Sequence, residues 1–558
     1  MTTCPNPSSL CIEKVLIKNF RCFEGEFELA LNDGLNIIVG NNEAGKSTIL
    51  EAINLALTGL LNGRYLKNEL SQYLFNKTIL NNYLKSLKSK KPSLPPSITI
   101  ELHFDDKETK HEILKGNGNL HKLKRCGISL RVEFDEEYLS EYNELIKNEK
   151  VTSLPIEYYK IVWKSFARQK VTTRTIPVKT AFINSAAAKY SNGTDIYLSK
   201  IIKNALEDSE KVSLSQSYRE LIHNFDDNKA VSDIGDKFSK QVELSKKKVR
   251  LSADTGSANG WEDLLTIFLD DIPFQYVGKG EQCIVKTNLA LSQDRAQKSS
   301  LILIEEPENH LSHTTLNHLI NFINDKCSNK QVIITTHSSF VANKLGLKDL
   351  ILLNNATTTT LKKLKESTQK YFSTLPGYNT LRLLLANSAI LVEGDCDELV
   401  VQKIYLQEYK KLPIEDGIDV ISVGLSYKRF LELAKQVDKK AAALRDNDNK
   451  LTSIKNNDKD YLPKKDRRQV LFFDQVAYEY KGKLEKYNYN TLEPCLFRAN
   501  SIKKLNKILG KNFKTEDELL EYINRKKTWC ALKVFESKEI IQAPDYIAKA
   551  IEFVHEEG

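Results

Sequence analysis

The feature that most constrains the fold is a short glycine loop between two apolar segments near the start of the chain. Residues 40–47 read GNNEAGKS and fit the pattern G-x-x-x-x-G-K-[ST]. The apolar run LNIIVG at 35–40 precedes the loop, and STILEAINLALTGLL at 47–61 follows it with helical apolar spacing. Strand, glycine loop and helix in this order predict the opening of an α/β domain. A chance glycine turn would not have both flanks in place.

This loop is predicted to bind the phosphates of ATP. Gly40 and Gly45 let backbone N–H groups turn toward the β-phosphate. Lys46 reaches the β- and γ-phosphates, and the Ser47 hydroxyl can bind Mg²⁺. The other loop residues expected at the nucleotide are Asn41, Asn42 and Thr48.

Two further apolar runs end in polar residues that suit the same site. LILI at 301–304 leads into Glu305, expected to hold the Mg²⁺ shell, and Glu306, expected to polarise the attacking water. Two surface acids are the simpler alternative, but the strand before them and the proline after them argue against it. QVIITT at 331–336 ends at His337, a candidate γ-phosphate sensor, although a lone histidine at a strand end is more often structural.

The order of these motifs resembles that of ABC-type ATPases of the RecF/SMC-like branch. VGKGEQ at 277–282 resembles their signature loop, and NFR at 19–21 precedes the phosphate loop as in that branch, with Arg21 at the nucleotide. The resemblance implies a dimer in which the signature loop closes on the partner's nucleotide, with Ser312 in the loop between the two sites. The signature residues are Gly278, Gly280, Glu281 and Gln282.

A second group of acids lies in the last third of the chain. Glu393 ends the strand-like SAILVE, and Asp397 follows one helical turn later. Asp446 and Asp448 follow the strand-like AAAL, where alternation would point both carboxylates to one side. NTLEPCL at 490–496 adds Thr491 and Glu493, the last of the expected metal ligands. Converging acids repel one another at pH 7, so they call for two Mg²⁺ or Mn²⁺ ions, which can cleave phosphodiesters. A lone D-x-D more often marks a solvated turn.

The E-G-x-x-D, S-V-G and D-x-D segments together resemble a Toprim domain, whose nuclease branch normally has Glu where Asp397 stands. An ABC-type ATPase followed by Toprim resembles the OLD (overcoming lysogenisation defect) nucleases, which include Gabija-type and retron-associated anti-phage effectors. The resemblance implies a T-x-E, matched by Thr491 and Glu493, and a catalytic lysine near the C-terminus. Lys538 is the first choice for that lysine, with Lys533 and Lys549 as alternatives.

The expected fold is therefore α/β, an ABC-type (RecF/SMC-like) ATPase domain with an inserted helical dimerisation arm, followed by a Rossmann-like Toprim domain. The arm lacks sustained heptads, so it should be short. The segment 365–380 reads as an interdomain linker. The expected boundaries are 1–179 for the first ATPase part, 180–262 for the arm, 263–370 for the second ATPase part and 371–558 for the Toprim nuclease domain.

Composition indicates the kind of partner and the cellular compartment. The 558 residues carry a formal net charge of +9, which permits a polyanionic partner such as DNA. Basic runs at 246–250, 438–440 and 464–468 could follow a phosphate backbone, although such runs are more often solvated faces. Nine cysteines without a C-x-x-C pair, no signal peptide and no apolar run near ~18 residues predict a cytoplasmic protein with no membrane segment.

The leading hypothesis is a metal-dependent DNA endonuclease, nicking or cutting both strands, that ATP binding or hydrolysis gates in a homodimer or tetramer. It would act in anti-phage defence, with a helicase or a retron reverse transcriptase as a candidate partner. Two alternatives belong to other classes. One is an ATP-dependent nucleic-acid-binding scaffold that recruits an effector. The other is a topoisomerase or primase, but 376–558 is too short to house the domain of a nucleophilic tyrosine.

Overall fold

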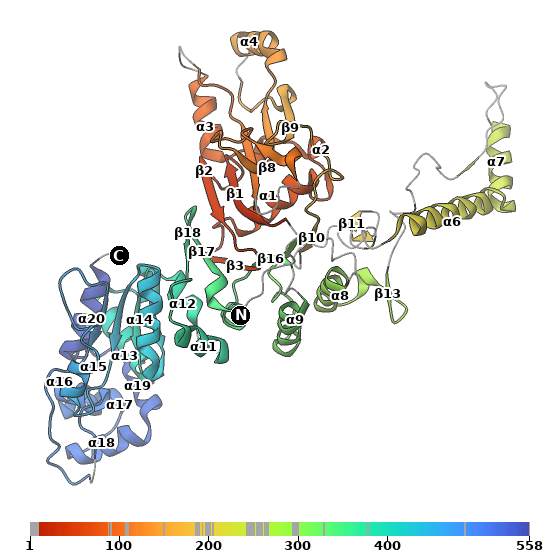
Figure 1. The fold of residues 1–558 in the computed structure, drawn as a ribbon. Helices are drawn as coiled ribbons and strands as arrows, with labels where there is room; N and C mark the ends of the chain where they lie inside the picture. The colour runs from red at the N-terminus through yellow and green to blue at the C-terminus, as the bar shows by residue number, and fades with distance from the viewer. Residues whose placement is uncertain are drawn as a thin grey trace. The chain divides into compact units, whose positions relative to one another are not determined.

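The chain forms two compact units in a computed structural model (Figure 1). The first unit comprises 1–336 and 353–357, and the second 337–352 and 358–558. The structure describes residues 10–556 apart from 88, 90–91, 106–110, 149–150, 185–189, 192–193, 196–201, 203–205, 242–250, 253–260, 262–266, 293–300, 327–329, 376–378 and 485–486.

A parallel sheet carries the glycine loop of the first unit. Its neighbouring strands are, in order, β10 (Thr180–Asn184), β15 (Leu301–Glu305), β16 (Gln331–Thr335) and β3 (Leu35–Gly40). Buried apolar residues dominate β3, β15 and β16, as parallel strands covered on both faces require. Helix α1 (Lys46–Thr58) begins at the end of the loop and is buried along most of its length. The predicted strand, loop and helix are confirmed.

An antiparallel sheet packs on the other side of α1, which contacts strands of both sheets. Its order is β2 (Glu26–Ala30), β1 (Ile12–Lys18), β6 (Ile98–Phe104), β8 (Arg125–Phe134) and β7 (Lys115–Gly116), with β9 (Tyr159–Ser165) also on β8. Gln331 joins the two sheets, because its Nε2 donates to Ile12 O at 2.7 Å and its Oε1 accepts from Ile12 N at 2.9 Å. One glutamine therefore ties the first strand of the chain to β16.

The range predicted as a helical arm begins differently from expectation. Its first residues form β10, which pairs with β15 because the apolar Phe182 and Ile183 complete that edge of the sheet. Helices α6 (Asp208–Asp226) and α7 (Lys229–Gln241) supply the expected helix. The basic run at 246–250 lies outside the described residues. Dimerisation through this range stays a prediction.

The remaining elements of the first unit are short or peripheral. They are β4 (Leu60–Leu61), β5 (Arg64–Tyr65), α2 (Leu66–Glu69), α3 (Lys77–Ser86), α4 (Leu139–Asn148), β11 (Tyr190–Ser191), β12 (Thr194–Asp195), β13 (Phe268–Leu269), β14 (Ile272–Pro273), α8 (Lys279–Ser292) and α9 (His313–Lys326). The chain enters the second unit at residue 337, returns to the first unit over 353–357, and then continues in the second unit. The strands around this return are β17 (Leu350–Asn354) and β18 (Thr357–Thr360).

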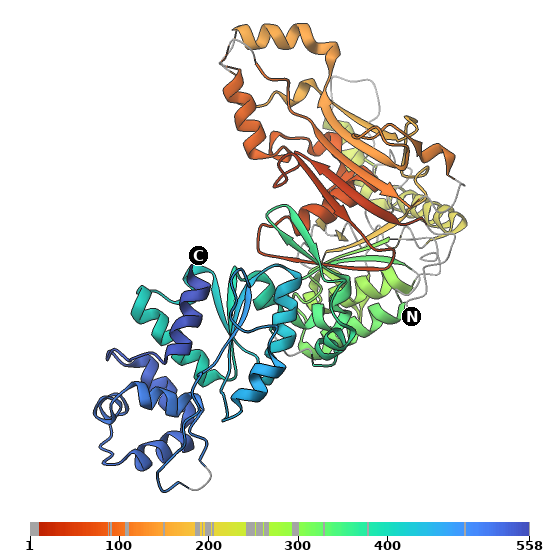
Figure 2. The same ribbon diagram turned by 60° about the vertical axis from the view of Figure 1, so that its left-hand side comes forward.

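A four-stranded parallel sheet is the centre of the second unit, with helices on its faces (Figure 2). Its order is β20 (Ile418–Ser422), β19 (Ser388–Val392), β21 (Lys440–Leu444) and β22 (Gln469–Phe472). The chain leaves β19 toward β20 and then returns to the other side with β21. The carboxyl ends of β19 and β21 therefore flank a topological switch point, where α/β sheets bind ligands.

Helices make up most of the rest of the second unit, some of them packed on the sheet and others on neighbouring helices. They are α10 (Ser339–Leu345), α11 (Glu366–Thr374), α12 (Thr380–Leu385), α13 (Asp395–Tyr409), α14 (Tyr427–Gln436), α15 (Leu451–Asn457), α16 (Leu492–Ala499), α17 (Ile502–Leu509), α18 (Glu516–Arg525), α19 (Lys527–Glu536) and α20 (Asp545–His555). Of the helices that the structure describes, none combines the length and apolar content needed to cross a bilayer.

The predicted linker at 365–380 is wrong over most of its length. Residues 366–374 form α11, and its Phe372 is fully buried against Phe430, with ring centroids 5.1 Å apart. Thr368 Oγ1 also donates to Glu432 Oε2 at 2.7 Å. This polar, proline-flanked stretch reads as a linker, but the buried ring of Phe372 and the hydrogen bond of Thr368 dock it on the second unit.

Candidate active sites

The glycine loop of the first unit is closely packed. Gly45 has φ 102°, in the left-handed region, and a Cβ there would lie 2.8 Å from Cys22 Sγ. A Cβ at Gly40 would lie 2.6 Å from Leu353 O. Asn41 and Asn42 are exposed, whereas Thr48 is buried at the start of α1. A side chain at Gly40 would collide with the main chain of Leu353, and one at Gly45 would collide with neighbouring side chains and strain the left-handed backbone.

Lys46 lies inside this loop among glutamates. Its Nζ donates to Gly40 O at 2.9 Å and to Asn41 O at 3.0 Å. Burial lowers the pKa of Lys46, and the neighbouring Glu306, Glu308 and Glu305 act against that shift. The ammonium group is therefore held where nucleotide phosphates would meet it.

The acids after β15 converge on the same loop. Burial raises the pKa of Glu305, and a hydrogen bond from Ser47 lowers it, so the two expected Mg²⁺ ligands lie together. Glu306 has φ 44°, an uncommon value for a non-glycine residue, and its N–H donates to Thr335 O at 3.0 Å. Its Oε2 accepts from Asn309 Nδ2 at 2.7 Å. The turn after β15 thus sets the direction of the Glu306 side chain.

Glu308 is a member of this site that the sequence reasoning missed. Its Oε1 accepts from Thr336 Oγ1 at 2.7 Å, and its charge acts on Lys46. The sequence feature that could have revealed Glu308 is its position in the acidic segment EEPE, at the end of the apolar run LILI. Arg21 pairs with Glu51 of α1, and its charge also reaches Glu305. His337 follows β16 and Thr336 directly, and its role as a sensor stays a prediction.

Two of the four signature residues have roles within the chain. The Gln282 amide donates to Phe274 O at 2.8 Å and to Val277 O at 2.9 Å, which closes the turn before α8. A Cβ at Gly280 would lie 2.5 Å from His310 O, so the glycine lets α8 approach the acidic turn. Glu281 is exposed, and Gly278 has open space around it. Action on a partner's nucleotide stays a prediction, as does the linking role of Ser312, which contacts Thr315 at the start of α9.

The second unit gathers the five predicted acids at the carboxyl ends of its strands. We call Glu393, Asp397, Asp446, Asp448 and Glu493 the acid cluster. Asp446 N donates to Glu393 Oε1 at 3.3 Å, which joins the ends of β21 and β19. Asp397 Oδ2 accepts from Gly394 N at 2.8 Å, and Thr491 Oγ1 donates to Glu493 Oε2 at 3.0 Å.

Electrostatics shows how closely these carboxyls face one another. Burial, together with the charges of the other four acids of the cluster, raises the pKa of Asp446 to about 9. Burial and the charges of Glu493 and Glu393 raise the pKa of Asp397 to about 7. Without cations, both groups would hold protons near neutral pH. The arrangement is therefore costly unless positive charge is supplied.

The donor set fits a hard divalent cation. All five side chains offer carboxylate oxygens, the ligands that Mg²⁺ and Mn²⁺ prefer. In the part of the chain that the structure describes, no three His, Cys, Asp or Glu side chains are yet spaced to hold one ion. Metal binding would therefore draw the carboxylates inward, and the positive charge would lower the pKa values of Asp446 and Asp397.

The alternation argument for Asp446 and Asp448 is wrong. Strand β21 ends at Leu444, and Asp448 and Asn449 have φ 46° and 60°, so the chain turns there. Asp448 accepts from Asn488 Nδ2 at 2.7 Å. A left-handed turn, and not an extended strand, brings the second aspartate toward the cluster.

Lys527 is the lysine that the structure places at the acid cluster. Its Nζ lies 2.9 Å from Glu493 Oε1, and the charges of Glu493 and Asp446 favour its charged form. Lys538 lies exposed beyond α19, Lys533 pairs with Glu536 at 2.9 Å, and Lys549 pairs with Asp545 at 2.7 Å. The expectation that Lys538 is the catalytic lysine stays a prediction, and Lys527 joins it as a candidate because it contacts Glu493. Only the packing of α19 on α13, the helix of Asp397, could reveal this.

The basic run at 438–440 is not a solvated face. Lys439 Nζ donates to Ala386 O, and burial lowers the pKa of this lysine to about 8. Lys440 Nζ lies 4.7 Å from the Phe553 ring centroid. At 464–468, Lys464 and Lys465 are exposed, whereas Arg467 Nη1 donates to Leu462 O at 2.6 Å. The run 464–468 alone, among the described basic runs, keeps free lysines for a polyanion.

Comparison with known families matches both units. The family described as AAA ATPase domain matches residues 11–342, and the family described as Overcoming lysogenization defect protein-like, TOPRIM domain, matches residues 384–448. The α/β fold class, with the ATPase domain first and the Toprim domain second, rests on these matches and on the two parallel sheets.

Individual proteins resemble shorter parts or share only a distant likeness. Structural maintenance of chromosomes protein 6 of Saccharomyces cerevisiae is 56% identical over 46 residues, which is 8% of this chain and 4% of that protein. The SMC head domain from Thermotoga maritima is 13% identical with a TM-score of 0.28, over 62% of this chain and 97% of that one. The recombination mediator RecF with ATP is 14% identical with a TM-score of 0.32, over 63% and 98%.

Proposed function

The chain belongs to the AAA ATPase domain family and joins that domain to an OLD-like Toprim domain, and from this premise we propose an ATP-dependent DNA endonuclease. Cleavage would occur at the acid cluster, and nucleotide would bind at the glycine loop. The observation that carries the proposal is the convergence of five carboxyls, with the pKa of Asp446 raised to about 9. Such a site favours divalent cations and a phosphodiester substrate.

The residues of the acid cluster have separable roles in this proposal. Glu393, Asp397, Asp446, Asp448 and Glu493 would hold Mg²⁺ or Mn²⁺, two ions in the full site. When bound, the ions would lower the pKa of a water nucleophile and stabilise the leaving oxygen. Lys527, 2.9 Å from Glu493, would neutralise charge that develops on the phosphate oxygens. Thr491 orients Glu493 through its 3.0 Å hydrogen bond.

In the first unit, Lys46 would neutralise the phosphates of ATP, and Ser47 with Glu305 would hold its Mg²⁺. Glu306 would orient the attacking water, because the turn after β15 fixes its backbone. Nucleotide-dependent pairing of two such units through Gly278 and Glu281 would gate cleavage.

The biological setting follows from the OLD-like match and the resemblance to anti-phage effectors. We propose a role in anti-phage defence as a homodimer or tetramer, with a helicase or a reverse transcriptase as a candidate partner. The N-terminal ATPase unit supplies the assembly surface in this proposal.

Plasmid cleavage tests the function directly. Purified protein is incubated with supercoiled plasmid in Mg²⁺ or Mn²⁺, with and without ATP, and products are separated on a gel. We expect nicked or linear DNA with metal and none with EDTA. Intact plasmid under all conditions, from folded protein that still binds DNA, would favour the scaffold alternative.

A further inference from the structure

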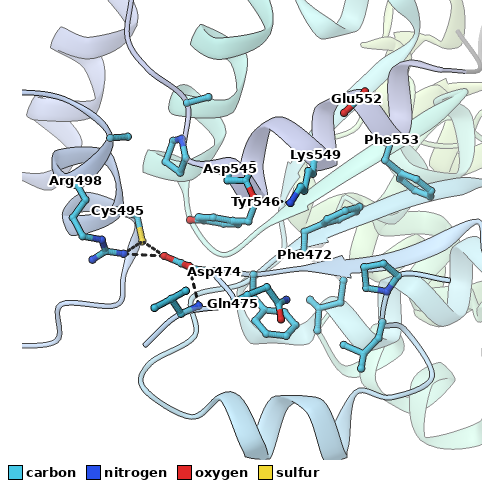
Figure 3. Close-up of a pocket in the computed structure, with 18 of the residues that line it drawn as sticks. Phe472, Asp474, Gln475, Cys495, Arg498, Asp545, Tyr546, Lys549, Glu552 and Phe553 are labelled. Atoms are coloured by element: carbon cyan, nitrogen blue, oxygen red, sulfur yellow. Dashed lines mark hydrogen bonds and ion pairs between the residues drawn. The ribbon is translucent and has the colours of Figure 1, made fainter. Parts of the chain in front are cut away.

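A large cavity lies beside the acid cluster in the second unit. Its volume is about 1140 Å³, and residues of β22, α16, α20 and the loop after β22 line it (Figure 3). In that view Phe472 and Phe553 stand at one end, and Asp474 with Arg498 at the other, with Tyr546 between. The proposed hydrolysis does not use this space.

Aromatic rings form much of the cavity wall. Phe472 and Phe553 pack with centroids 5.6 Å apart, and Tyr546 is nearly fully buried in α20. Arg498 stacks over Tyr478 with its guanidinium carbon 3.9 Å from the ring centroid. Tyr478 nevertheless keeps 39% of its surface exposed. A flat aromatic surface that stays open to solvent suits a flat ligand.

The charges around the cavity argue against a phosphate as its occupant. Arg498 is already engaged, since Nη2 donates to Asp474 Oδ2 at 2.9 Å and Nη1 to Tyr489 O at 2.6 Å. Lys549 pairs with Asp545 at 2.7 Å. Acidic side chains outnumber basic ones in the lining, with Asp474, Asp545, Glu552 and Glu556 against Lys455, Arg498 and Lys549. A neutral planar group is the better match.

Two structural elements serve both the cavity and the acid cluster. Asn447, between Asp446 and Asp448, donates through Nδ2 to Asp474 O at 3.0 Å and to Val476 O at 2.9 Å. The first turn of α16 carries Glu493 in the cluster and Cys495 in the cavity wall. The loop of Asn447 and the first turn of α16 therefore join the cavity wall to the acid cluster.

From this juxtaposition we propose that the cavity receives an unpaired nucleobase of the substrate strand, stacked on Tyr478 and edged by the exposed amide of Gln475. The inference rests on the proposed nuclease function for its orientation, because the phosphate of the same strand lies at the acid cluster. It predicts a preference for DNA with unpaired bases over regular duplex. Base stacking on an aromatic side chain is sequence-tolerant, so the preference concerns structure.

Fluorescence anisotropy with the full chain in Ca²⁺ tests this proposal. The probes are a labelled 12-nucleotide oligothymidine, the same chain with abasic sites throughout, and a 12-base-pair duplex. We expect oligothymidine to bind on the order of ten-fold more tightly than the abasic strand. Tyr478→Ala should abolish that difference, and Tyr478→Trp should retain it. Tyr73→Ala, an exposed tyrosine of the first unit, is the matched control and should change nothing.

Tyr478→Ala should fold, because the main chain of this residue holds the loop. Its N–H donates to Asn490 Oδ1 at 2.8 Å, and its C=O accepts from Asn490 Nδ2 at 2.9 Å. Should it misfold, Gln475→Ala at an exposed position replaces it, with a smaller loss expected for oligothymidine alone. Equal affinity of the wild type for normal and abasic strands would overturn the proposal.

Two further measurements distinguish a failure of this inference from a failure of the proposed nuclease function. Thymidine monophosphate, added at a concentration equal to the Kd of the oligonucleotide, should not displace it. Displacement at that concentration would assign the cavity to a free nucleotide and overturn the strand proposal. Plasmid cleavage is measured in parallel. Cleavage without Tyr478-dependent binding would sink this inference alone, whereas Tyr478-dependent binding without cleavage would sink the nuclease function and keep base recognition.

Discussion

The glycine loop of the first unit and the acid cluster of the second unit both lie where parallel strands end, yet they balance charge differently. Around the loop, Lys46 and Arg21 accompany the glutamates at 51, 305, 306 and 308. In the acid cluster, Lys527 and Arg445 accompany five carboxyls, and the pKa of Asp446 rises to about 9. The acid cluster therefore has the larger excess of negative charge and the greater need for ions from solution.

This difference shows how one architecture can serve two tasks. A site with its own cations can bind a polyphosphate that arrives with a single Mg²⁺. A site with excess carboxylates stays partly protonated until divalent ions bind, so metal supply controls it. The two sites should therefore respond differently to charge removal and to chelators.

The largest effect is expected from Asp446→Asn, which should lower plasmid cleavage on the order of 10³-fold or more, since it removes a proposed metal ligand. ATP turnover should stay within about two-fold of wild type. Asp395→Asn, an exposed acid on α13 outside the cluster, is the matched control and should cleave normally. Cleavage by Asp446→Asn at the wild-type rate would remove the cluster from the mechanism.

Glu306→Gln should lower ATP turnover by about 10²–10³-fold while ATP binding persists, because the amide can no longer polarise water. Steady-state phosphate release and a nucleotide-binding titration separate the two effects. Glu24→Gln, an exposed glutamate of the same unit, should leave both unchanged. Loss of binding together with turnover would instead give Glu306 a role in holding the nucleotide.

Lys527→Ala should lower cleavage by about ten- to a hundred-fold, since one positive charge near the phosphate oxygens is lost. Lys533→Ala on the same helix is the control, because Lys533 pairs with Glu536 and not with the acid cluster. A drop in kcat with an unchanged KM for plasmid would support the assignment. Equal losses in both variants would mean that α19 matters only for packing.

The smallest effect concerns stability in EDTA. Because the pKa of Asp446 is about 9 in the folded chain and near 3.9 when unfolded, the folded state binds more protons between these values. The unfolding free energy should therefore fall as pH rises through this window. Thermal unfolding should show a lower Tm at pH 8 than at pH 5. The difference should be roughly 2–4 °C for each kcal/mol of unfolding free energy lost. Mg²⁺ or Asp446→Asn should raise the Tm at pH 8, and a flat profile in EDTA would contradict the burial of this charge.

Short sequence patterns correctly predicted the strands and the helix that lead into the two sites. The strand before Gly40, the helix after Lys46 and the strands before Glu305 and Glu393 follow from apolar runs beside glycine and acidic residues. Lys527 could not be found this way, since its place depends on α19 packing against α13. Asp448 was placed by the wrong argument because a left-handed turn leaves no clear trace in residue spacing.

Strand β3, which ends in the glycine loop, has β16 as a hydrogen-bonded neighbour, with Val332 opposite Leu35. During translation, the ribosome must therefore add almost three hundred residues before this neighbour leaves the exit tunnel. The loop is made well before the rest of its sheet, and Gln331 reaches back to Ile12 when β16 is added. A nascent chain should consequently stay unable to retain nucleotide until most of the first unit has been synthesised, which delays any premature engagement of its catalytic machinery.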